Sequence, residues 1–226
     1  MPGLRHNVCF GLLLLLLQAG TGRELVAQAE DSIRRADSLR VLELYGSAQE
    51  TVEEGRPYQA LNILGQALQI AMQEKMEGLE AEVLEMIGDI YHGEGQSDEA
   101  IPYYVRAASI LEFAGNHERL RGVYGKTGAA YSEVGIHEKA REYYLEEQRL
   151  LAENDEAGRL ALAEKLGVAS LKSGKADTAV IHFRQMERLL EARDTMPVEA
   201  WKHLVKAHRE TGDLDTSLEY ARKLFA

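Results

Sequence analysis

The sequence is poor in the residues on which disulfide scaffolds, thiol enzymes and β-rich proteins depend. Its 226 residues include one cysteine, four prolines, one tryptophan and four phenylalanines. The single thiol, Cys9, can form neither an intramolecular disulfide nor a cysteine-based zinc site, so these classes are excluded. Abundant Ala, Leu, Glu, Lys and Arg favour helices and exclude a β-sandwich.

Basic residues are also in deficit. Lys and Arg total 26 against 37 Asp and Glu, which gives a formal net charge of −11. This charge disfavours binding to nucleic acid or to anionic lipid by the molecule as a whole, so we expect no nucleic-acid partner. The 45% hydrophobic and 28% charged residues are otherwise typical of a globular protein.

Residues 1–22 have the pattern of a signal peptide. Arg5 supplies a positive charge, residues 8–17 are continuously apolar, and small residues follow. Such a run is too short to cross a hydrocarbon core, which takes about 20 residues. We expect an exported protein, periplasmic or secreted, with no transmembrane span after removal of the signal. A short buried or frayed helix is the alternative.

The rest of the chain repeats itself. Glycines recur at intervals of 40, 40, 39 and 38 residues, at Gly55, Gly95, Gly135, Gly174 and Gly212. A small residue follows each glycine by five positions: Ala60, Ala100, Ala140, Ala179 and Ser217. Four positions further come Leu64, Tyr104, Tyr144, Phe183 and Ala221. In the three central units another glycine precedes the turn by seven positions: Gly88, Gly128 and Gly167.

Each unit is predicted to be a helical hairpin. The turn glycine can adopt the left-handed conformation that ends a helix. Polar residues that follow it are expected to cap the second helix, namely Ser97, Asp98, Asp177 and Asp215. The small residues of the first helix let the second approach, and the aromatic residue inserts between hairpins. A single hairpin cannot bury both of its faces, so the hairpins must stack.

This pattern resembles the tetratricopeptide repeat family over residues 41–226. The second unit carries the family signature at Leu84, Ile87, Gly88, Tyr91, Gly95, Ala100, Tyr104 and Ala107. The third carries it at Tyr124, Gly128, Tyr131, Gly135, Ala140 and Tyr144. The resemblance implies an all-α fold, an α-solenoid of about five stacked helix-turn-helix hairpins. The expected repeats are residues 41–80, 81–120, 121–159, 160–197 and 198–226.

The sequence departs from the family pattern in several places. The period of 38–40 residues exceeds the common period of about 34, which lengthens each hairpin by about 8 Å. This longer period resembles that of exported or regulatory bacterial members. Thr51, Ser170 and His208 replace the signature tyrosine, and Glu147 replaces a small residue.

In the family, the first helices line a concave groove that binds proteins or extended peptides. The resemblance therefore assigns groove positions to Glu82, Glu85, Asp89, Gly122, Gly125, Lys126, Ala129, Ser132, Lys165, Lys172, Lys202, Lys206 and Arg209. Glu164, Val168, Leu171 and His203 lie between them. Such a groove would run from acidic to basic along the stack, and its basic end fits an acidic partner.

Two parts of this groove have alternative explanations. Gly122 and Gly125 could leave space for a bulky side chain of a partner, or they could reflect close packing around Tyr131 and Tyr104. The basic residues Lys202, Lys206 and Arg209 could bind a carboxylate-bearing peptide, or they could pair with Glu199 and Glu210 on a solvated face.

Motifs typical of enzymes are incomplete. Gly125-Lys126-Thr127 imitates the end of a phosphate-binding loop, but Leu120 stands where that loop needs glycine. His203 and His208 are five residues apart, which does not align two ligands on one helix face. Pairs such as Glu146-Glu147 fit exposed helix faces. We therefore expect no catalytic residues, no cofactor and no metal site.

Two expectations concern the ends of the repeat region. Residues 23–40, with Leu25, Ile33, Ala36 and Leu39, are predicted to form a lead-in helix that covers the first hairpin, or a linker. Ala226 is expected inside the last helix, with no polar capping helix after it. That end would then dock onto a partner, or onto a second copy end to end, unless the chain continues.

The sequence thus favours a noncatalytic, exported scaffold for protein–protein interaction. The alternative is a sensory input module of a signal-transduction protein, of the histidine kinase or transcription regulator type, truncated at Ala226.

Overall fold

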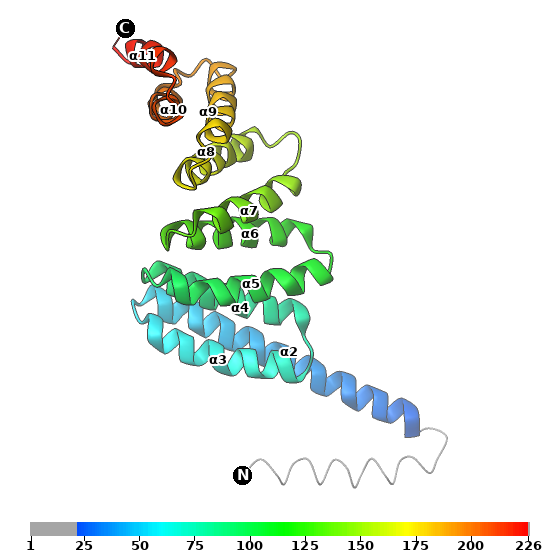
Figure 1. Ribbon diagram of the computed structural model, residues 1–226. Helices are drawn as coiled ribbons and strands as arrows, with labels where there is room; N and C mark the ends of the chain where they lie inside the picture. The colour runs from blue at the N-terminus through cyan, green and yellow to red at the C-terminus, as the bar shows by residue number, and fades with distance from the viewer. Residues whose placement is uncertain (1–21, 226) are drawn as a thin grey trace. The chain divides into compact units, whose positions relative to one another are not determined.

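The computed structural model of the protein describes residues 22–225 (Figure 1). The predicted signal peptide, apart from Gly22, and Cys9 within it therefore lie outside the described residues, as does Ala226. The described residues form ten α-helices and no strand, so the all-α prediction is confirmed. The chain divides into two compact units, Met1–Val83 and Leu84–Ala226, and the boundary between them falls inside helix α4 (Glu77–Gly93).

The first unit contains α2 (Gly22–Glu53), α3 (Pro57–Gln73) and the start of α4. Proline at the first position of α3 suits a helix start, because its missing N–H has no intrahelical partner there. Helices α2 and α3 pack side by side (Figure 1). Their buried apolar residues are Val41, Leu44 and Ala48 from α2, and Ala60, Leu64, Ala67 and Ala71 from α3.

The expected lead-in segment is helical and continuous with the first helix of the first repeat, since α2 runs for 32 residues without a break. The prediction that Ile33, Ala36 and Leu39 cover the first hairpin is wrong, and the side chain of Leu25 lies outside the described ones. Ile33 and Leu39 are 53% and 61% exposed, and Ala36 is exposed too. Their spacing does not form the continuous stripe that would bury one face of the helix.

The second unit holds the remaining four hairpins. After α4 come α5 (Ser97–Phe113), α6 (His117–Glu133), α7 (His137–Arg149), α8 (Glu156–Lys172), α9 (Ala176–Glu191), α10 (Val198–Thr211) and α11 (Leu214–Lys223). From α5 onward each helix packs against the next. Helices α4, α6 and α8 begin four residues before the expected repeat boundaries, whereas α10 begins where its repeat was predicted to start.

The five turn glycines adopt the predicted left-handed conformation. Their φ angles lie between 75° and 81°, a region that costs any residue with a Cβ atom. The turns between hairpins use the same conformation at Lys75, Gly115 and Asp194, with φ between 52° and 67°. Only one of these three positions has the glycine that would have revealed it in the sequence.

The paired glycines and aromatic residues explain how closely the helices of a hairpin approach each other. A Cβ atom on Gly88 would lie 2.6 Å from Cε1 of Tyr104, and one on Gly128 would lie 2.5 Å from Cε1 of Tyr144. Gly167 faces Phe183 in the same way. The predicted role of these small residues is confirmed.

The predicted helix caps are wrong. Ser97, Asp98, Asp177 and Asp215 lie inside the first turns of their helices. Side-chain caps are instead made by Asn116, Asp155 and Asp213, which accept hydrogen bonds from backbone N–H groups of α6, α8 and α11. Two of these three caps start first helices, so the cap signal belongs mainly to the turns between hairpins.

The last helix, α11, ends at Lys223. It leaves Leu214 and Leu218 65% and 52% exposed. Across residues 22–225, no helix combines the length and the apolar character needed to cross a membrane.

Candidate partner-binding surface

Helices α4, α6, α8 and α10, the first helices of their hairpins, carry all of the predicted groove positions. Those with exposed side chains or backbone are Asp89, Gly122, Lys172, Lys202, Lys206 and Arg209. Half-buried positions are Glu85, Lys126, Ala129, Ser132 and Lys165, as is Glu82 in the first unit, and Gly125 is buried. The predicted residues therefore differ in how accessible they are to a partner.

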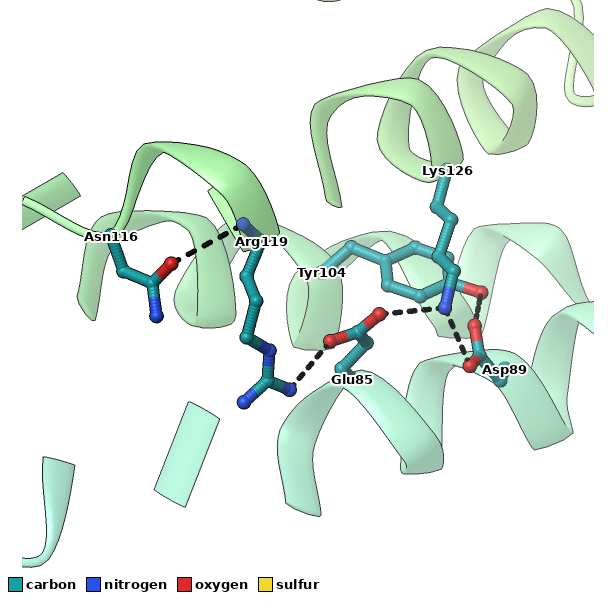
Figure 2. Close-up of polar contacts among 6 residues, drawn as sticks. All are labelled: Glu85, Asp89, Tyr104, Asn116, Arg119 and Lys126. Carbon is teal, nitrogen blue, oxygen red and sulfur yellow. Dashed lines mark hydrogen bonds and ion pairs between the residues drawn. The ribbon is translucent and has the colours of Figure 1, made fainter. Parts of the chain in front are cut away.

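Helices α4 and α6 are joined by a network of charges (Figure 2). Lys126 Nζ donates hydrogen bonds to Glu85 Oε1 and Asp89 Oδ2, both at 2.7 Å. Arg119 donates to the other oxygen of Glu85 at 2.9 Å, and the Tyr104 hydroxyl donates to Asp89 at 2.8 Å. The structure thus brings together Glu85, Asp89 and Lys126. It adds Arg119, which the sequence did not single out, and the hydroxyl of Tyr104, whose ring was predicted only to pack.

The pKa shifts in this network show that its acidic and basic groups stabilise each other's charged forms. Burial alone would raise the pKa of Glu85, but hydrogen bonds from Lys126 and Arg119 keep it below its ordinary value. Burial would lower the pKa of Lys126, but Asp89 and Glu85 raise it. Burial and the carboxylate of Asp89 raise the pKa of Tyr104. Two acids and two bases offset each other, so this part of the surface presents no free charge of either sign.

The space expected beside Gly125 is filled. A Cβ atom on Gly125 would lie 3.0 Å from a carboxylate oxygen of Glu147, whose side chain is only 16% exposed. Lys165 Nζ lies 3.4 Å from Glu147 and 5.4 Å from the centre of the Tyr144 ring. The interpretation of Glu147 as part of an exposed face is therefore wrong. Gly122 does have open space, with nothing within 4 Å of a Cβ atom.

Helix α10 carries the basic end of the predicted groove. Lys202 donates a hydrogen bond to Glu199 at 2.6 Å, so for this residue the solvated-pair interpretation holds. Lys206 and Arg209 are exposed and form no ion pair with any described residue. Lys172, at the end of α8, is exposed as well. Among the described residues, Lys172, Lys206 and Arg209 are therefore the exposed and unpaired cations of the predicted groove.

A buried carboxylate that the sequence analysis missed lies behind α10. Glu187 on α9 accepts hydrogen bonds from the indole N–H of Trp201 at 2.8 Å and from the hydroxyl of Tyr220 at 3.1 Å. Lys223 Nζ lies 3.6 Å from it. Burial and Glu187 raise the pKa of Tyr220. The only available signal was Trp201, because a buried indole N–H needs an acceptor.

The motifs that imitate enzymes have structural explanations. Lys126 and Thr127 lie inside α6, where the Thr127 hydroxyl donates to the backbone oxygen of Val123. His203 stacks on Phe183 with ring centres 4.6 Å apart, and His208 stacks on Tyr220. Within the part of the chain that the structure describes, no three His, Cys, Asp or Glu side chains are grouped so that they could hold a metal ion.

Comparison with known proteins gives a family match over part of the chain and a shared fold. Residues 79–153 match the family model described as tetratricopeptide repeat. No curated protein matches the sequence. Among solved structures, nearly identical TPR-like repeats assigned to a kinesin light chain of Podosopora anserina superpose with a TM-score of 0.64 at 17% identity, covering 82% of this chain and 93% of that one. Residues 79–153 thus match the tetratricopeptide repeat, and the described residues have the fold of a tetratricopeptide repeat solenoid.

Two further solved structures are similar to this chain. BtubC from P. vanneervenii has a TM-score of 0.64 at 16% identity and covers 91% of this chain and 90% of its own. MamA from Desulfovibrio magneticus RS-1 has a TM-score of 0.62 at 16% identity and covers 82% of this chain and 93% of its own. At these identities the likeness shows the fold alone, and the fold is that of an α-solenoid.

The tetratricopeptide repeat match and fold suggest a general role. Tetratricopeptide repeat proteins bind proteins or peptides and are generally noncatalytic scaffolds. The tetratricopeptide repeat fold of this chain accordingly suggests a scaffold for protein–protein interaction.

Proposed function

We propose that the chain is a noncatalytic, exported scaffold that binds an extended acidic peptide or partner helix along α8 and α10. The observation that carries this proposal is the pair Lys206 and Arg209, which are exposed and have no ion-pair partner among the described residues. Residues three apart on a helix lie on the same face, so both can reach one carboxylate-rich segment.

The rest of the first-helix surface supports this location. The charges of α4 and α6 pair with one another, and the space beside Gly125 is occupied by Glu147. Lys172 adds a third accessible cation near the end of α8. An acidic partner therefore gains more from α8 and α10 than from the helices before them.

A binding measurement with defined peptides tests this proposal. We expect a fluorescent peptide of alternating Glu and Ala to bind and a Gln and Ala peptide of the same length to bind more weakly. Added salt should weaken the first complex, because exposed charges are screened within about 10 Å at 0.1 M salt. Lys206→Glu with Arg209→Glu should reduce affinity roughly tenfold or more, as expected for the loss of two charged contacts.

The matched control reverses two other exposed arginines, Arg188 on α9 and Arg222 on α11, to glutamate. It changes the net charge by the same amount away from the proposed surface. Equal weakening in both variants would assign the effect to net charge and would contradict the proposed site.

Export rests on the signal-like pattern of residues 1–22. We expect the protein in the extracytoplasmic fraction of its native host with a new N-terminus near residue 23, measured by intact mass. Recovery from the cytoplasm with residues 1–22 retained would contradict export and would leave the binding proposal unaffected.

A further inference from the structure

Helix α3 contains no charged residue. Its 17 residues, Pro57–Gln73, include no Asp, Glu, Lys, Arg or His, although 28% of the whole chain is charged. Every other described helix carries both acidic and basic or histidine side chains. Loss of charge over a whole helix calls for a physical reason.

The missing charges belong to the outward side of the helix. The α3 outer face consists of its exposed residues Tyr58, Gln59, Asn62, Gly65, Gln66, Gln69, Met72 and Gln73. In the other second helices, the position of Tyr58 is held by Asp98, Glu138, Asp177 and Asp215, and the position of Gln66 by Arg106, Glu146, Gln185 and Lys223. The repeat fold therefore accepts charge at these positions, and only the first repeat excludes it throughout.

The centre of this face is a glycine that the chain itself does not explain. Gly65 is the ninth of the 17 residues, it is exposed, and nothing lies within 4 Å of a Cβ atom built on it. Its φ angle is ordinary for a helix, so no turn requires glycine here. Glycine inside a helix is destabilising relative to alanine. It does allow a second helix to approach the backbone closely.

We propose that the α3 outer face is the contact between two copies of this chain, with α3 crossing its counterpart at Gly65. Two copies that each carry a net charge of −11 repel each other. A face without charge is where such molecules can meet. Charged residues are depleted and Tyr and Met enriched at the centres of protein interfaces, as on this face.

The chemistry of the face also suits a copy of itself. A two-fold interface must be self-complementary, because the same patch serves both partners. Each Gln or Asn amide has both donors and an acceptor, so identical amide-bearing faces can satisfy each other. One helix pair is smaller than a standard interface of about 800 Å² per partner, so the association is weak and depends on concentration.

Sedimentation velocity of the full chain tests this dimer. We expect the wild type to shift from monomer to dimer between about 1 μM and about 1 mM, the range of weak association. Gln66→Glu with Gln69→Glu should remain monomeric, with association weakened by roughly tenfold or more, since like charges would face each other across the two-fold axis. Ser109→Glu with Gln148→Glu, which adds the same charge on α5 and α7, should associate like the wild type.

A charge-swap mixture tests direct apposition. The double Glu variant mixed with Gln66→Lys and Gln69→Lys should form a heterodimer, although neither variant forms a homodimer. Gly65→Ala is expected to have opposite effects on the stability of the monomer and on the affinity of the dimer. It should raise the melting temperature of the dilute monomer and weaken the dimer.

Three results would overturn the proposal. The first is a wild type that stays monomeric over the whole concentration range. The second is a double Glu variant that associates as the wild type does. The third is an association that survives the α3 variants and is lost on Leu218→Glu, which would assign the contact to α11 instead.

Discussion

Single glycines set the separation of the two helices in each central hairpin. The Tyr144 ring is 4% exposed and lies where the side chain of any larger residue at position 128 would stand. Such a ring cannot move aside as the end of an exposed side chain could. This contact explains why the sequence spacing of glycine and aromatic residues is so regular.

Gly128→Ala is expected to destabilise the protein by roughly 1–3 kcal/mol, the usual cost of forcing an atom into a packed core. Gly122→Ala in the same helix has open space and should stabilise by up to about 1 kcal/mol, because alanine favours helix. Urea unfolding measures both. Equal effects of the two substitutions would contradict the packing role of Gly128.

Glu187 is expected to stabilise the contact between α9 and the last hairpin. Glu187→Gln retains the shape of the side chain but removes the charge that faces Lys223 and one acceptor for Tyr220. We expect a loss of roughly 1–3 kcal/mol, typical of a buried group left without its hydrogen-bond partner. A shifted Trp201 emission spectrum in the folded variant should accompany it, and an unchanged spectrum would show that the indole does not sense this carboxylate.

The sequence predicted some residues of this kind and missed others, for one physical reason. Gly88, Gly128 and their aromatic partners belong to the same repeat, so their packing is recorded as a fixed spacing. Glu147 is half-buried and Glu187 is buried, because Lys165, Trp201 and Tyr220 approach them from other helices. Spacing along the chain does not reveal such partners, and a charged residue in a helix is otherwise expected to be exposed.

At the scale of elements, ion pairs connect the third and fourth repeats. Glu138 on α7 accepts a hydrogen bond from Arg141 at 2.9 Å and one from Lys175, before α9, at 2.5 Å. Hydrogen bonds from these two residues lower the pKa of Glu138 to about 2 from an ordinary value of 4.5. The carboxylate therefore stabilises the folded state only while it is ionised.

The stabilisation by Glu138 should be fully present above about pH 4.5 and should disappear as the pH falls to about 2, because the folded-state pKa is the lower one. Glu138→Gln should therefore be less stable than the wild type at pH 7, and the difference should shrink through this acid range. Thermal unfolding at several pH values measures it. A difference that does not vary with pH would indicate that the charge of Glu138 is not responsible.

The helices themselves were predicted more accurately than their ends. Each hairpin and each turn glycine was found, because apolar periodicity and glycine spacing record them directly. The caps at Asn116 and Asp155 were not predicted, because they lie in the turns between hairpins, whereas the repeated glycine marks the turn within each hairpin. The exposure of the first part of α2 was not predicted, because Ile33 and Leu39 are apolar and apolar residues were expected to be buried.

At the scale of the whole molecule, stability depends on contacts between neighbouring repeats. Helices α10 and α11 pack against each other and, among the described helices, chiefly against α9. A hairpin with one neighbouring repeat has less support than a hairpin with two. Local unfolding should therefore begin there.

We expect Trp201 fluorescence to report unfolding at a lower urea concentration than far-UV circular dichroism, because the single tryptophan lies in this last hairpin. Coincident transitions would show that the whole chain unfolds as one cooperative unit.

Under the proposed function, the ion pairs of Lys126 would also affect which partners bind. Glu85 and Asp89 already accept hydrogen bonds from two of the three N–H groups of this ammonium and offset its charge, so a further carboxylate would gain less there than at an unpaired cation. Glu85 and Asp89 would therefore compete with the partner for Lys126, which disfavours binding of isolated acidic groups between α4 and α6. Under the proposed function, an acidic partner would bind first at Lys206 and Arg209, and only a partner with many closely spaced carboxylates would also bind at Lys126.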